Sequence, residues 1–286
     1  MDIAFRLLNG LLMIAMPIVL GIYLARRTGQ RWRLFLAGAV LFIGSQVLHI
    51  PFNLVVLNPI LAQLGFGEGI LGARLLIGAL LVGLSAGLFE ELTRWLGLRY
   101  WLKDDRSWSS ALMYGAGWGG AEAILLGLAV LWFFVQALLF QQGRLQSVIP
   151  PEQLELVEAQ FAAYWETPLF LNLLGAVERA FALAVQVSLS VMVMRAVARH
   201  KLLWLLAAIA WHTLVNAVAV VAVTQVGAVA AEAIIGVMAA ISLVVIFGLK
   251  EEEPPQEQKP GASRAEFKPV PVKVTEEKLE DSRYST

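Results

Sequence analysis

The stretch ALMYGAGWGGAEAILLGLAVLWFFVQALLF, residues 111–140, contains one charged side chain, Glu122. About 20 apolar residues in a helix cross the ~30 Å hydrocarbon core of a bilayer. A helix also satisfies its own backbone hydrogen bonds, which lipid cannot do. This stretch therefore predicts a transmembrane helix, whose excess length predicts tilt, a kink or extension beyond the bilayer. The glycines of GAGWGG, residues 115–120, predict close approach of a neighbouring helix backbone.

Six further apolar stretches have a similar length, so we expect an all-α bundle of about seven transmembrane helices. The predicted spans are 5–24, 34–57, 70–92, 111–140, 169–194, 202–223 and 227–249. The composition agrees, with 58% hydrophobic residues, 15% charged residues and a mean hydropathy of +0.70. Such a chain is too apolar for a soluble domain. The first span has no small-residue cleavage site after it and predicts a retained helix rather than a signal peptide.

Charge and cysteine content exclude several classes of protein. The formal net charge is zero, so no basic surplus indicates nucleic-acid binding. The absence of cysteine excludes disulfide frameworks and thiolate metal sites. The bilayer is therefore the first expected partner of this chain.

The distribution of Lys and Arg predicts the topology, because these residues accumulate in short cytoplasmic loops. The second and sixth loops have no basic residue, and the fourth has only Arg144. We therefore expect a multi-pass plasma-membrane protein with its N-terminus outside and its C-terminus in the cytoplasm. The basic residues of the first, third and fifth loops are Arg26, Arg27, Arg31, Arg33, Arg94, Arg99, Lys103, Arg106, Arg195, Arg199 and Lys201.

Two segments outside the spans have their own character. The chain divides into a transmembrane domain, residues 1–250, and a tail, residues 251–286, rich in Glu, Lys, Pro and Ser. Such a tail cannot bury enough apolar surface to offset the entropy of ordering, and predicts either a disordered cytoplasmic extension or a docking segment. Residues 151–164 of the fourth loop predict a short amphipathic helix on the outer surface.

Several ionisable and amide side chains fall inside the predicted spans. A carboxylate at the bilayer centre costs ~2.5–3.5 kcal/mol on insertion scales, so it persists where it is paired or functional. Side chains four residues apart share a helix face, and polar faces must turn towards the bundle interior. We expect one polar site in the cytoplasmic half of the bundle. The side chains concerned are Glu90, Glu91, Arg94, Trp118, Glu122, Glu178, Arg179, Gln186, His212 and Asn216.

Ordinary structural interpretations of these residues stay open. Glu90 with Arg94 is also the pattern of an ion pair near a helix end, and Trp118 among glycines is also typical of packing. Four further structural interpretations are open. His212 and Asn216 would form a hydrogen-bonded pair, Glu178 and Arg179 a structural charge pair, Glu232 would lie at the membrane interface, and His49 would hydrogen-bond to a neighbouring helix.

Five short motifs resemble a known group of proteins. EELTR (90–94) and HTLVN (212–216) resemble the E-E-x-x-R and H-x-x-x-N motifs of the type II CAAX-protease-like superfamily. More closely, GWGGAEA (117–123), ERAFA (178–182) and QVLHIPF (46–52) resemble the YhfC family of intramembrane metalloproteases. The resemblance implies an all-helical fold in which paired glutamates and a histidine activate water for peptide-bond cleavage. It also implies histidines at or near Trp118 and Gln186, which this chain lacks.

Two forms of chemistry fit such a site, one with a metal ion and one without. A zinc hydrolase needs about three protein ligands and a carboxylate that accepts a proton from water. This chain has no H-E-x-x-H motif, so a site for zinc or another divalent ion would use His212 with Glu91, Glu122 and Glu178. The metal-free form uses Glu90 with His212 as general base and Asn216 as donor to the oxyanion.

These patterns favour an intramembrane metal-dependent endopeptidase that cleaves a membrane-associated peptide or protein near the cytoplasmic leaflet. The predicted catalytic residues are Glu90, Glu91, His212 and Asn216. One alternative is a protease-like scaffold or partner-binding protein that has lost ligands. The other is a proton-coupled transporter of a small solute that uses the carboxylates as a relay, although no internal repeat supports it.

Overall fold

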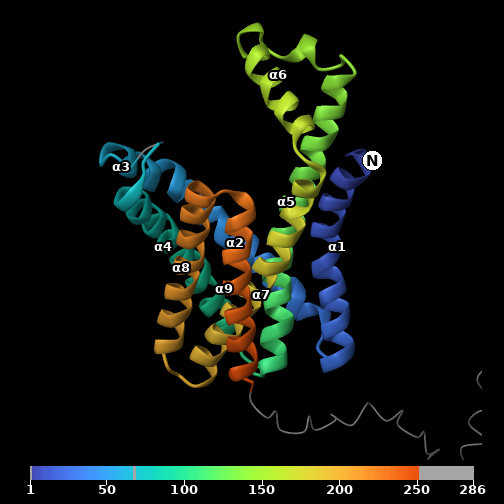
Figure 1. Ribbon diagram of the computed structural model, residues 1–286. Coiled ribbons are helices and arrows are strands. Elements are labelled where there is room, and N and C mark those ends of the chain that lie inside the picture. Colours follow the sequence, from blue (N-terminus) through green and yellow to red (C-terminus); the bar gives the residue numbers. More distant parts are fainter. Residues whose placement is uncertain (1, 67–68, 251–286) are drawn as a thin grey trace, which may run out of the picture. The chain divides into compact units, whose positions relative to one another are not determined.

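The computed structural model describes residues 2–66 and 69–250 as a bundle of α-helices without strands (Figure 1). Seven of the described helices are long and apolar enough to cross a membrane, as the sequence predicts. They include α1 (Asp2–Thr28), α2 (Trp32–Phe52), α4 (Gly72–Leu96), α5 (Trp108–Gln141), α7 (Leu174–Ala198), α8 (Leu203–Val226) and α9 (Ala228–Gly248). The predicted tail, residues 251–286, lies outside the described residues.

Short helical segments extend or connect the spans. The π-helical turn η1 (Asn53–Leu57) and helix α3 (Asn58–Gln63) prolong α2, and the π-helical turn η2 (Gly97–Trp101) prolongs α4. Between α5 and α7 lie η3 (Gln146–Val148), α6 (Pro151–Glu166) and η4 (Leu169–Leu173). The amphipathic helix expected over residues 151–164 is therefore present as α6.

Helix α5 is longer than its neighbours and carries α6 at its far end. It has 34 residues, and Figure 1 shows it continuing past the N-terminal end of α1, with α6 folded back beside it. Phe133 of α5 packs against Phe161 and Tyr164 of α6, with ring centroids 5.5 and 5.1 Å apart. The excess length of residues 111–140 is thus used to extend beyond the ends of the neighbouring helices.

Glycines bring the helices that carry the site into close contact. A Cβ at Gly117 of α5 would lie 1.9 Å from the carbonyl oxygen of Phe35 on α2. A Cβ at Gly119 would lie 2.8 Å from the Cβ of Gln186 on α7. On α4, a Cβ at Gly87 would lie 3.0 Å from the carbonyl oxygen of Ile209 on α8. These contacts place α5 between α2 and α7, and α4 against α8.

Candidate functional site

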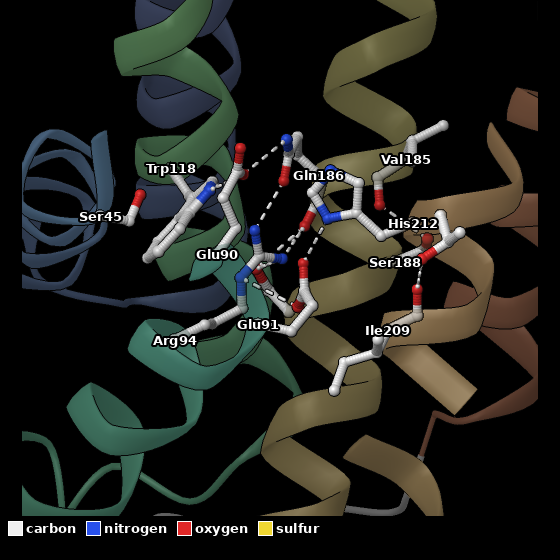
Figure 2. A network of polar contacts seen from close by, with 12 residues as sticks. Ser45, Glu90, Glu91, Arg94, Trp118, Val185, Gln186, Ser188, Ile209 and His212 are labelled. Atoms are coloured by element: carbon white, nitrogen blue, oxygen red, sulfur yellow. Dashed lines mark hydrogen bonds and ion pairs between the residues drawn. The ribbon is translucent and has the colours of Figure 1, made fainter. Parts of the chain in front are cut away.

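Four helices contribute the six side chains at the centre of one buried polar network (Figure 2). Glu90, Glu91 and Arg94 come from α4, which presents them on one side because three and four residues make about one helical turn. Helix α5 supplies Trp118 and α7 supplies Gln186, while α8 supplies His212. Each of these six side chains is buried, with exposed fractions of 7% or less.

Glu91 and His212 form a buried pair within the network. His212 Nδ1 lies 2.8 Å from Glu91 Oε1, and the two residues are 3% and 0% exposed. A carboxylate at this distance holds the imidazole with its proton on Nδ1. In the neutral ring the Nε2 atom then carries the lone pair, and it has no hydrogen-bond partner in the described part of the chain. This nitrogen is able to accept a proton.

Arg94 ties Glu91 to helix α7. Its Nε lies 3.5 Å from Glu91 Oε2. Its Nη1 donates to the carbonyl oxygen of Gln186 at 3.0 Å and to Ser190 Oγ at 3.1 Å, and its Nη2 donates to Gln186 Oε1 at 2.6 Å. The guanidinium also lies 4.3 Å from the ring centre of Trp118. One cation therefore fixes the position of Glu91 relative to two other helices.

Glu90 accepts hydrogen bonds from three neutral donors. Gln46 Nε2 donates to its Oε1 at 3.1 Å, and Trp118 Nε1 donates to its Oε2 at 3.1 Å. Gln186 Nε2 lies 3.5 Å from the same Oε2. Trp118 and Gln186 occupy the positions where the resemblance implies histidines. In this chain they are hydrogen-bond donors to a carboxylate.

A chain of hydrogen bonds continues from Glu90 along α2. Because Gln46 donates its amide N–H to the carboxylate, its Oε1 faces His49 Nδ1, 3.3 Å away, which must donate. His49 Nε2 then accepts from Asn53 Nδ2 at 2.9 Å, and Asn53 Oδ1 accepts from Ser85 Oγ at 2.8 Å. Every donor points towards Glu90, which assigns the Nδ1–H tautomer to His49.

Glu122 and Glu178 belong to a second cluster around Arg179. Arg179 Nη1 donates to Glu122 Oε1 at 2.7 Å, and Arg179 Nη2 donates to Glu178 Oε1. Gln186 Nε2 lies 3.1 Å from Glu122 Oε2 and so connects the two clusters. The single site expected from the sequence is therefore divided into two clusters. Glu91 contacts His212 in the first, whereas Glu122 and Glu178 bind Arg179 in the second, with Gln186 between the two.

Asn216 borders the site without a hydrogen-bond partner in the described residues. It follows His212 by one turn of α8 and is half-buried. A Cβ at Gly83 of α4 would lie 3.4 Å from the Cβ of Asn216. Its amide therefore lies at the contact of α4 and α8, on the side of α8 that carries His212.

The four predicted metal ligands do not assemble into a metal site. Glu91 lies with His212, whereas Glu122 and Glu178 bind Arg179. No group of three or more His, Asp or Glu side chains suitable for a metal occurs within residues 2–66 and 69–250. The groups around Glu90 and Glu91 include the N–H donor of Trp118 and the guanidinium of Arg94. Neither can ligate a cation, and the positive charge of Arg94 repels one. The described residues therefore do not fit a zinc ion.

Sequence reasoning missed the part played by Gln46. It counted Arg94 among the basic residues that follow the third span, with an ion pair to Glu90 near a helix end as one open interpretation. Arg94 is 0% exposed and lies within the bundle, bound to α7. Gln46, His49 and Asn53 are spaced by three and four residues, so they share one face of a helix that is otherwise apolar. This polar stripe was the available signal for the hydrogen-bond chain.

The fold and the network define a class of protein: a polytopic membrane helix bundle with a buried carboxylate, imidazole and guanidinium site within its spans. Residues 12–249 match the family described as YhfC intramembrane metalloprotease, and the chain belongs to this family. It is 31% identical over 261 residues to the uncharacterized membrane protein YhfC of Bacillus subtilis (strain 168). That alignment covers 87% of this chain and 96% of the relative. No solved structure matches the chain.

Proposed function

We propose that this chain is an intramembrane peptidase that cleaves a membrane-associated peptide or protein and activates water with the pair His212 and Glu91. The observation that carries the proposal is the buried contact of His212 Nδ1 with Glu91 at 2.8 Å. The contact leaves Nε2 as an acceptor inside a membrane-spanning bundle. Membership of a family described as intramembrane metalloproteases supports this reaction class.

The proposed reaction is hydrolysis by general-base catalysis. A water molecule gives a proton to His212 Nε2 while its oxygen attacks the carbonyl carbon of the peptide bond. The Asn216 amide, one turn along α8, would donate a hydrogen bond to the oxyanion. The tetrahedral intermediate then collapses, the C–N bond breaks, and the leaving amine takes the proton from His212. One water is consumed, and an acid and an amine are produced.

The other members of the network position this pair. Arg94 fixes Glu91 relative to α7, and Glu91 fixes the ring of His212. Glu90 already accepts from Gln46, Trp118 and Gln186, so its oxygens are less available to water than Nε2 of His212. We therefore assign the base to His212 with Glu91, where the sequence hypothesis paired His212 with Glu90. The proposed reaction uses no metal ion, because the donor set does not fit one.

One observation favours a non-catalytic alternative. The carboxylates of Glu90, Glu122 and Glu178 are each bound by donors from this same chain. A protease-like scaffold that has lost catalysis would show such internally paired carboxylates. The unpartnered Nε2 of His212 is the feature that this alternative leaves without a role.

Mapping of new protein N-termini in cells separates the two functions. Cells expressing the full chain should contain cleaved membrane proteins that are absent with Glu91→Gln or His212→Gln, because loss of general-base catalysis lowers rates by roughly 10²–10⁴-fold. The matched control is Glu232→Gln, a carboxylate on α9 that has no hydrogen bond to the network in the described residues. If cells with the wild-type chain and cells with either variant contain the same protein N-termini, cleavage by this chain is contradicted and the scaffold function is supported.

Metal analysis tests the proposed metal independence of the site. Purified protein should contain no stoichiometric zinc, and a chelator should leave cleavage unchanged. One tightly bound divalent ion per chain, together with loss of cleavage on chelation, would return the site to the metal-dependent form expected from the sequence.

A further inference from the structure

A cavity of about 580 Å³ lies at the end of the bundle where α4 continues into η2 and where α7 meets α8. Arg99, Arg106 and His200 line it together with the aromatic side chains of Trp95 and Tyr100. We call it the basic cavity. It is separate from the Glu91 and His212 site, because none of the buried carboxylates lines it.

The guanidinium of Arg106 is fixed by the backbone. Its Nε donates to the carbonyl oxygen of Lys103 at 2.8 Å, and its Nη2 donates to the carbonyl oxygen of Arg99 at 3.1 Å. Its Nη1 is buried and has no hydrogen-bond partner in the described residues. Burial and the nearby charge of Arg99 lower the pKa of Arg106 from its ordinary value, and Asp104 acts in the opposite direction. An anion would satisfy Nη1 and offset both effects.

The second guanidinium is held in place by aromatic rings. The guanidinium of Arg99 lies 4.8 Å from the ring centre of Trp95 and 5.6 Å from that of Tyr100. Such stacking leaves the N–H edge of an arginine available for a ligand. The carboxylate of Asp105 is bound to Arg33 at 2.6 Å and does not line the cavity.

The turn between α7 and α8 completes the lining. His200 has φ of +53°, a left-handed conformation that a residue other than glycine rarely adopts. The turn therefore places an imidazole at the basic cavity where glycine would be the ordinary choice. The described lining combines two arginines and a histidine with no carboxylate.

We propose that the basic cavity binds a phosphate-bearing anion, with the phosphate held by Arg99 and Arg106. Planar guanidinium groups bind phosphate oxygens through paired N–H donors. Arg99 and Tyr100 lie in the last turn of the span Gly72–Trp101, at the depth where lipid headgroups meet Trp and Tyr side chains. A lipid phosphate and a soluble phosphate share the required chemistry, and the experiment below distinguishes them.

The test uses the purified full chain in detergent, titrated with phosphatidic acid, with phosphatidylcholine and with inorganic phosphate, and read by native mass spectrometry and unfolding temperature. Phosphatidic acid should bind with about one molecule per chain and raise the unfolding temperature. Arg99→Gln should weaken this binding by about fivefold or more, since one cation at a headgroup contributes on the order of a factor of five. The matched control Arg31→Gln removes an exposed charge at the same end of the bundle.

Arg99→Gln is the primary variant because Arg106 also holds backbone carbonyls, and its loss alone could unfold the loop. Equal weakening by Arg99→Gln and Arg31→Gln would overturn the proposal, since only a diffuse basic surface would then bind the lipid. Saturable binding of inorganic phosphate that is lost in Arg99→Gln, with no preference for phosphatidic acid, would support the site and assign it to a soluble anion.

Discussion

Arg94 is a buried cation whose contacts reach three helices. It is 0% exposed, as is its partner Glu91, and its remaining donors bind Gln186 and Ser190 of α7. A buried ion pair contributes little net stability by itself. Removing one partner is costly, because it leaves the other charge buried and unpaired. The chain therefore depends on Arg94 for the geometry of Glu91 more than for a favourable pair energy.

Arg94→Met should lower the free energy of unfolding by about 3–5 kcal/mol, the range for breaking a buried pair. Arg94→Lys should recover only part of this loss, because an ammonium group cannot make the forked contacts to Gln186. Thermal unfolding in detergent measures both, and the exposed Arg31→Met is the control. Full recovery by lysine would show that charge alone, and not the guanidinium geometry, stabilises this region.

The tautomer of His49 is a second prediction at the scale of a single residue. The direction of the hydrogen bonds from Ser85 to Glu90 requires a proton on Nδ1 and none on Nε2. The contact with Glu91 requires a proton on Nδ1 of His212 as well. The chain has three histidines, so ¹⁵N-histidine NMR can resolve them, with His200→Gln and His49→Gln for assignment. A protonated Nε2 on His49 would mean that the hydrogen-bond chain runs in another direction.

At the scale of helices, the contact of α2 with α5 depends on missing side chains. A Cβ at Gly38 of α2 would lie 2.1 Å from the carbonyl oxygen of Tyr114, whereas a Cβ at Gly44 of the same helix meets nothing within 4 Å. Gly38→Ala should therefore force α2 and α5 apart and destabilise the protein by about 1–3 kcal/mol or more. Gly44→Ala should be neutral or stabilising by up to about 1 kcal/mol, because alanine favours the helix.

The unfolding temperatures of Gly38→Ala and Gly44→Ala should be measured in the same detergent. The comparison is matched, because each variant adds one methyl group to the same helix. Separation of α2 from α5 should also move Gln46 away from Glu90, so Gly38→Ala should perturb the ¹⁵N signals of His49 as well. Equal stability of the two variants would contradict the close contact of these helices.

The sequence predicts the helices well because the bilayer imposes a length and a polarity on each of them. The seven spans follow from apolar length, and α6 follows from its amphipathic pattern. The π-helical turns η1 and η2 do not follow, since a one-residue change in hydrogen bonding leaves no hydropathy signal.

The partners within the site were only partly predictable. Helical spacing indicates that Glu90, Glu91 and Arg94 lie close together on α4. It cannot tell which glutamate meets His212, because adjacent helix positions point about 100° apart and the rotation of α4 against α8 decides the contact. The structure pairs His212 with Glu91 through the close packing at Gly87. Similarly, the separation of Glu122 and Glu178 from His212 depends on Arg179, whose partners the sequence left open.

At the scale of the whole molecule, the polar groups around Gln186 form one connected system inside an apolar bundle. Gln186 contacts Arg94, Glu90 and Glu122, and so joins the cluster of Glu91 and His212 to the cluster of Arg179. The described surface that faces lipid is rich in exposed Leu, Val and Ile side chains. Buried polarity and exposed apolarity are the reverse of a soluble protein, and this arrangement keeps the proposed chemistry away from lipid.

The orientation of the bundle is the last prediction, and it rests on the ends of the helices. The connections from α1 to α2, from η2 to α5 and from α7 to α8, together with the helix turns that flank them, carry most of the Lys and Arg of the described residues, so this end should face the cytoplasm. The sequence contains no cysteine, so a maleimide labels only the single cysteine that is introduced. Leu64→Cys, Gln153→Cys and Val226→Cys should react with a membrane-impermeant maleimide added to intact cells. Asp104→Cys and Lys201→Cys, both exposed at the basic end, should react only after lysis. The reverse pattern would invert the orientation, and a mixed pattern would contradict the assignment of seven spans.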